Sequence, residues 1–87
     1  MKMPTVSEFF GIRIMIRFGD HNPPHFHAYY QQDKVLVEIR DGKIKGYMSE
    51  RALRLILEWL DLHRDELMVA WQMASVGMEP EPIEPLK

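Results

Sequence analysis

Three of the four histidines in the chain fall between His21 and His27, and two adjacent prolines separate the first from the other two. Imidazole changes its charge near neutral pH and is also a common metal ligand. The prolines push each preceding residue toward an extended conformation, which lowers the entropy cost of holding the ring nitrogens in place. This segment, which begins at Asp20, is the candidate functional site.

One chemistry for this segment is metal binding. Neutral imidazoles from His21, His25 and His27 can form an open site for one divalent transition metal ion such as zinc, copper or nickel. His25 and His27 stand two residues apart on a predicted strand, so their side chains point the same way. The spacing as a whole matches none of the common zinc signatures.

A second chemistry is acid–base catalysis on a phosphodiester or acyl group, with Asp20, His21, His25 and His27 as the candidate catalytic residues. Asp20 can orient one imidazole through a carboxylate hydrogen bond. No Ser-His-Asp arrangement or Gly-rich loop accompanies them. A third interpretation is structural, with the histidines packed as a rigid corner. The sequence leaves all three open.

Basic and aromatic side chains recur on the solvent side of the predicted strands. Such a face can neutralise and stack single-stranded nucleic acid, or it can bind a protein partner. An ordinary solvated surface is the alternative. The candidate partner-binding or nucleic-acid-binding residues are Arg13, Arg17, Tyr29, Arg40, Lys43, Lys45 and Tyr47, with Lys34 among them.

Charge is divided unevenly along the chain. Residues 1–54 carry nine Lys and Arg against six Asp and Glu, whereas residues 55–87 carry two against seven. The chain as a whole has a net charge of −2. This division predicts a basic face on one element and an acidic face elsewhere.

The apolar pattern up to Met48 predicts a four-stranded, mainly antiparallel sheet over about residues 10–48, after a lead-in over residues 1–8. Its clearest part is the period-two alternation from Phe10 to Phe18. Asp41-Gly42 predicts a two-residue hairpin turn. The expected strands are 10–18, 26–31, 34–40 and 43–48.

From Glu50 the apolar period becomes helical. One uninterrupted helix would be about 40 Å long, more than such strands can cover. We therefore expect two helices, about 50–61 and 63–76, over one face of the sheet. Ser49 is the predicted N-cap of the first helix, and Gly77 is the predicted C-cap of the second.

The chain of 87 residues predicts a single α+β domain over 1–87. Its last ten residues, 78–87, form a Pro/Glu-rich extended tail in which Ile83 and Leu86 can dock on the body. The chain has no cysteine and no apolar run long enough to span a bilayer. These features favour a cytoplasmic protein with no membrane partner.

Several segments together resemble the bacterial family known as domain of unknown function 4160. They are Met3–Ser7, Phe9–Gly11, Asp20–His27, Arg51–Leu55, Glu58–Leu67, Trp71 and Pro82–Leu86. The resemblance implies a small bacterial protein encoded beside another small protein, in a pair of the kind suspected to be a toxin–antitoxin system. It implies no catalytic residues.

The residues and the resemblance together favour an interaction module over an enzyme. It would be one half of a toxin–antitoxin-like pair, with the toxin component as the expectation and the neighbouring gene product as its partner. One alternative is a small histidine- or metal-dependent hydrolase acting on RNA. Another is a homo-oligomeric structural protein without chemistry.

Overall fold

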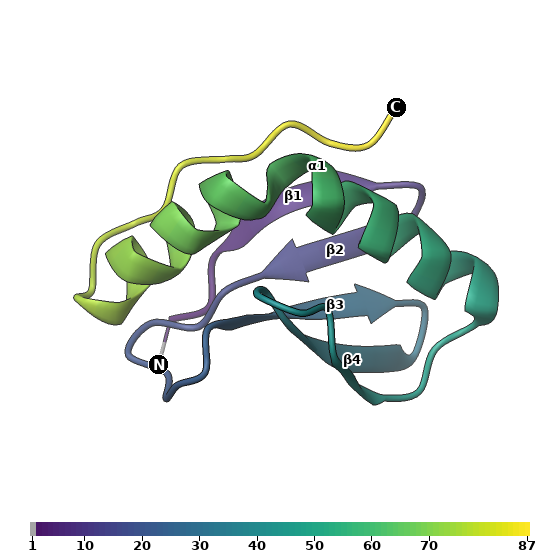
Figure 1. The fold of residues 1–87 in the computed structure, drawn as a ribbon, viewed down its shortest axis with the longest axis horizontal. Coiled ribbons are helices and arrows are strands. Elements are labelled where there is room, and N and C mark those ends of the chain that lie inside the picture. The colour runs from purple at the N-terminus through teal and green to yellow at the C-terminus, as the bar shows by residue number, and fades with distance from the viewer. Residues whose placement is uncertain (1) are drawn as a thin grey trace.

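The computed structural model describes residues 2–87. Five strands form one antiparallel sheet in chain order, and one long helix lies across one face of it (Figure 1). The α+β class and the antiparallel sheet are confirmed, but the sheet has five strands rather than four. The elements are β1 (Thr5–Phe9), β2 (Ile12–Met15), β3 (His25–Tyr30), β4 (Asp33–Glu38), β5 (Ile44–Gly46) and α1 (Glu50–Ser75).

The additional strand comes from a turn inside the expected strand 10–18. Phe10 and Gly11 both have positive φ angles, of 50° and 81°, and join β1 to β2 as a two-residue hairpin. Phe9 is buried, whereas Phe10 is 51% exposed. Phe10 therefore does not share the buried face of the later strand residues, although the alternation from Phe10 to Phe18 predicts that it does. Residues 5–8, expected as part of a lead-in, are therefore paired in β1. Phe rarely adopts positive φ, so the sequence carries no turn signal at Phe10.

The connection between β4 and β5 is longer than the predicted turn at Asp41-Gly42. Glu38 and Lys43 close it through a 2.9 Å backbone hydrogen bond, and Gly42 is the residue there with a positive φ. Ile39 leaves the strand ladder, becomes fully buried and donates its N–H to the Pro24 carbonyl at 3.0 Å. Burial of Ile39 thus sets the length of the loop and ties it to the histidine segment.

The C-terminal half of the domain contains one helix, so the prediction of two helices was wrong. Within α1, His63 has non-helical angles (φ −126°, ψ 22°), and the helix kinks there without ending. The Ser49 hydroxyl accepts the Ala52 N–H, as expected of an N-cap. The C-cap is Val76 rather than the predicted Gly77, which follows it with φ +79° and donates to the Ala74 carbonyl. The kink redirects the chain over the sheet without a break.

Trp59 is at the centre of the core between the sheet and α1. Its ring lies 5.2 Å from Phe9 and 5.8 Å from Phe26, and its Nε1 donates to the Glu84 carbonyl at 2.8 Å. The tail over residues 78–87 runs back along α1 (Figure 1). There the Ile83 N–H donates to the Val6 carbonyl of β1. The tail is therefore a packed element of the fold. Within residues 2–87, no helix has the length and apolar character needed to cross a membrane.

Truncating the tail anchor tests this packing. Ile83→Ala removes a side chain that is only 5% exposed, and we expect it to lower the free energy of unfolding by about 2–3 kcal/mol. Leu62→Ala, at a helix position that is 65% exposed, is the control and should change it by less than about 0.5 kcal/mol. Urea unfolding followed by Trp fluorescence measures both. Equal stability of the two variants would mean that the tail does not pack on the body.

Candidate functional site

The histidine segment, Asp20–His27, contains the end of the β2–β3 connection and the first three residues of β3, and backbone hydrogen bonds fix the connection at Gly19 and Pro24. The Gly19 N–H donates to the Ala74 carbonyl at the end of α1, at 3.1 Å. The Pro24 carbonyl accepts the Ile39 N–H from the β4–β5 loop. The segment is therefore held between the helix end and the sheet, and its side chains occupy defined positions.

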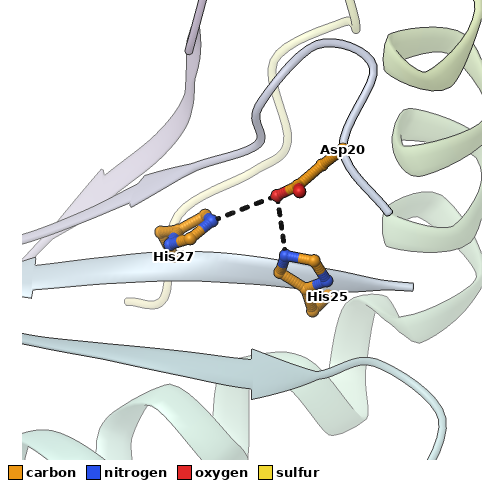
Figure 2. A group of neighbouring side chains, drawn as sticks. All are labelled: Asp20, His25 and His27. Carbon is orange, nitrogen blue, oxygen red and sulfur yellow. Dashed lines mark hydrogen bonds and ion pairs between the residues drawn. The ribbon is translucent and has the colours of Figure 1, made fainter. Parts of the chain in front are cut away.

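The Asp20 carboxylate lies between two imidazoles and is only 5% exposed. Its Oδ2 atom is 2.9 Å from His25 Nε2 and 3.5 Å from His27 Nε2, so one oxygen faces both rings (Figure 2). The other oxygen, Oδ1, accepts the backbone N–H of His21 at 2.9 Å. The expected orienting role of Asp20 is thus realised on His25.

His25 is the most deeply buried imidazole of the segment, with 2% of the residue exposed. Its Nδ1 atom lies 2.8 Å from the Pro23 carbonyl, which can only accept, so Nδ1 carries a proton. The ring also packs on Trp71 of α1, with 5.0 Å between the ring centroids. Because Nδ1 is the donor to Pro23, the Nε2 atom of His25 is left to face Asp20.

His27 joins the cluster to the outer face of the sheet, the face opposite α1. It pairs with Met15 on β2 and Leu36 on β4. Its ring lies 5.2 Å from that of His25, in an edge-on arrangement. The Nε2 atom is buried and, among the described residues, makes no hydrogen bond of good geometry; the Asp20 Oδ2 atom faces it at 3.5 Å. A buried imidazole nitrogen that is so weakly satisfied is costly and suggests a bound species there.

The remaining two histidines lie outside this cluster. His21 has 82% of its side chain exposed, and its Nε2 is 3.7 Å from Asp20 Oδ1. His63 lies at the kink of α1 and bonds to Glu66. Asp20, His25 and His27 are the residues that bring three ligand atoms within 4.8 Å of one another. The structure therefore puts Asp20 where the sequence suggested His21.

Burial and hydrogen bonding shift the proton affinities within the cluster. Burial raises the pKa of Asp20, but hydrogen bonds from the His21 N–H and from the imidazoles outweigh it, so this pKa lies below the usual 3.8. Burial lowers the pKa of His27 below 6.5, against the opposite effect of Asp20. At neutral pH the site therefore offers a carboxylate and a neutral imidazole.

The outer face of the sheet holds a pocket of about 290 Å³ beside His27, hereafter the outer pocket. Arg17 just after β2, Lys34 on β4 and Lys45 on β5 line this pocket together with Tyr29. A larger hollow of about 690 Å³ adjoins the β1–β2 hairpin and shares Tyr29, but it lies away from Asp20. The outer pocket is lined by Met3, Arg17, His27, Tyr29, Lys34, Val35, Leu36, Lys45 and Gly46.

The other predicted binding residues lie outside the outer pocket. Arg13 borders the larger hollow and pairs with Glu8 at 2.8 Å. Arg40 and Lys43 are exposed on the β4–β5 loop, and Tyr47 is 77% exposed just after β5. The predicted binding residues are therefore divided between the outer face of the sheet and one end of the sheet. The roles of these residues in binding stay predictions.

Comparison with known protein families matches residues 11–72 to a domain of unknown function, DUF4160. The match covers more than half of the chain, so the protein belongs to this family, as its sequence motifs indicate. It includes the whole histidine segment and most of α1. No curated protein and no solved structure matches the chain.

Removing the central carboxylate tests whether the cluster holds the β2–β3 connection. Asp20→Ala leaves His25 Nε2 buried without a partner, and we expect it to cost about 1–3 kcal/mol of unfolding free energy. Asp65→Ala, at an exposed helix position, is the matched control and should change stability by less than about 0.5 kcal/mol. Chemical denaturation compares the two. If Asp20→Ala were as stable as the control, the carboxylate would not anchor the segment.

Proposed function

We propose that this protein binds single-stranded RNA on the outer face of its sheet, as the toxin component of a two-gene pair. The observation that carries the proposal is the outer pocket, where Arg17, Lys34 and Lys45 surround Tyr29. Single-stranded RNA is recognised by cations that contact phosphates and by aromatic rings that stack on bases. The outer pocket combines both kinds of group in a small area.

The cations of the outer pocket are available to a ligand. Among residues 2–87, Arg17 and Lys34 take part in no ion pair, and Lys45 approaches Glu38 only at 3.9 Å. Exposed ion pairs of that length contribute little to stability, so a phosphate oxygen can replace Glu38 beside Lys45. Phosphates also accept stronger, charge-assisted hydrogen bonds from Arg and Lys. These residues therefore suit the backbone of a nucleic acid.

Tyr29 supplies the aromatic ring that would favour nucleic acid over other anions, because it can stack on a base. It lies opposite Arg13 on β2 and Lys34 on β4, so its ring is flanked by cations on both neighbouring strands. Two adjoining hollows open beside this ring. A base stacked on Tyr29 would thus have its flanking phosphates close to basic side chains.

The division of charge along the chain also supports RNA binding on the sheet side. Residues 1–54, which contain the whole sheet and the first turn of α1, carry a net +3, whereas residues 55–87, with most of α1 and the tail, carry −5. A polyanion is therefore repelled from the helix side and drawn to the sheet side. The net charge of −2 does not oppose binding on one face.

The family resemblance adds the second candidate, which is an acidic protein partner encoded by the neighbouring gene. Such a partner would cover the same basic face and block RNA. RNA hydrolysis is the activity a toxin of this kind would have, and His27 lines the outer pocket, where the phosphates of RNA would bind. The assays should therefore follow the length of the RNA as well as its binding.

Charge reversal tests RNA binding directly. We expect Arg17→Glu/Lys34→Glu to weaken the affinity for a labelled single-stranded RNA at least about tenfold, because two attractive contacts become repulsive. The slope of log affinity against log salt should fall by about 1.4, or about 0.7 for each lost phosphate contact. Fluorescence anisotropy at several salt concentrations measures both quantities.

The control for this variant is Arg51→Glu/Arg54→Glu, which makes the same charge change at exposed positions of α1. It should retain both the affinity and the salt slope. If both variants lost the same RNA affinity, the effect would come from net charge alone. That result would contradict RNA binding at a specific face. If the wild-type protein bound only its neighbour's product, and Arg17→Glu/Lys34→Glu abolished that binding, the protein partner would replace RNA.

A second variant separates base stacking from charge. Tyr29→Ala should weaken RNA binding by about 1–3 kcal/mol while leaving the salt slope unchanged, since stacking involves no counterion release. Tyr47→Ala, at a ring that is 77% exposed and outside the outer pocket, is the matched control and should bind like the wild type. Unchanged binding by Tyr29→Ala would show that the face recognises phosphates alone.

A further inference from the structure

We propose that Asp20, His25 and His27 form a binding site for one divalent transition metal ion. Two imidazole nitrogens and one carboxylate oxygen are a donor set that zinc and other borderline metals prefer. Three protein ligands leave further coordination positions for water or a substrate oxygen. The proposal concerns the metal alone and does not depend on RNA binding.

The strongest evidence is the pairing of His25 with Asp20. The Nδ1 proton of His25 is donated to the Pro23 carbonyl, so a neutral His25 points the Nε2 lone pair at Asp20. The carboxylate also presents lone pairs, and the two atoms are only 2.9 Å apart. Two acceptors at this distance repel each other unless a cation lies between them. Either a proton or a metal ion meets that requirement.

His27 favours the metal ion over a proton. One proton between His25 and Asp20 would satisfy that pair but would leave buried His27 Nε2 with only the long 3.5 Å contact to Asp20 Oδ2. A metal ion accepts lone pairs from several donors at once, so it can satisfy all three side chains.

The distances in the cluster are close to those of a bound site. Ligands about 2.0–2.2 Å from one ion stand about 3.3–3.6 Å apart in tetrahedral geometry. The Oδ2 atom of Asp20 is 3.5 Å from His27 Nε2, within this range, and 2.9 Å from His25 Nε2, somewhat below it. All three ligand atoms lie within 4.8 Å of one another. His27 has 19% of its side chain exposed and is the member with most room to adjust.

The surroundings of the cluster resemble those of metal sites in proteins. Metal-bound imidazoles usually donate their second nitrogen to a carbonyl or carboxylate, which fixes the tautomer. The Pro23 carbonyl does this for His25, while Trp71 packs against the same ring. His27 also lines the outer pocket, so a bound ion would border the space proposed for phosphates. The open coordination positions would be reached from that side.

Titration of chelator-treated protein with Zn²⁺ by calorimetry tests the site. We expect one equivalent to bind the wild-type protein, and His27→Gln to weaken binding by more than about tenfold, since loss of an outer-shell partner alone has that effect. Asp20→Asn should weaken it as well. The Asn amide can still donate to a neutral His25, so this variant preserves the fold while removing the anionic ligand.

Two histidine variants serve as controls. His21→Gln changes the exposed histidine of the same segment, and His63→Gln changes the histidine at the kink of α1; both should bind Zn²⁺ like the wild type. Co²⁺ absorption provides a second readout, because its visible bands report nitrogen and oxygen ligands and should disappear in His27→Gln. Circular dichroism and thermal unfolding establish that each variant is folded.

The outcomes separate clearly. No stoichiometric Zn²⁺ binding by the folded wild-type protein would overturn the proposal. Wild-type affinity in folded His27→Gln and Asp20→Asn would also overturn it, because the ion would then lie elsewhere. Loss of binding in His21→Gln, with retention in Asp20→Asn, would replace this site by one made of three histidines. None of these results depends on whether the protein binds RNA.

Discussion

Burial of the Asp20 carboxylate is the constraint on which the organisation of the site depends. A buried carboxylate is stable only when donors or cations replace the water that it loses. Here the His21 N–H and the His25 ring surround it, and His25 is fixed in turn by the Pro23 carbonyl. The β2–β3 connection can therefore adopt few conformations. The same interactions place His27 at the border between the core and the outer face.

Strand β3 joins the core and the candidate site through its alternation. Phe26 and Ala28 are fully buried beneath α1, while His27 and Tyr29 stand on the opposite face. A shift of one residue in the pairing of β3 would exchange these two sets, so burial of the apolar set fixes the position of the polar one. Packing thus determines where the chemistry lies, even though the packed residues take no part in it.

The remaining elements keep this arrangement rigid. The kink at His63 lets one helix follow the sheet, and just beyond it Arg64 Nε donates to the Ile39 carbonyl at 2.8 Å. Ile39 in turn donates to Pro24, so the helix, the β4–β5 loop and the histidine segment are linked in sequence. At the other end of α1, Gly19 bonds to Ala74. A small domain can hold a defined site because several elements converge on one loop.

The sequence by itself determined the α+β class, the N-cap of α1 and the concentration of histidines near Asp20. These features depend on local rules, because alternation, capping hydroxyls and turn residues act within a few positions. The turn at Phe10-Gly11, the continuity of α1 at His63 and the exclusion of His21 from the cluster were decided by the tertiary structure. Burial of Phe9 forces Phe10 into an uncommon backbone angle, and contacts between distant segments select which imidazoles face Asp20. No local pattern contains that information, since it arises only when the helix, loops and sheet pack together.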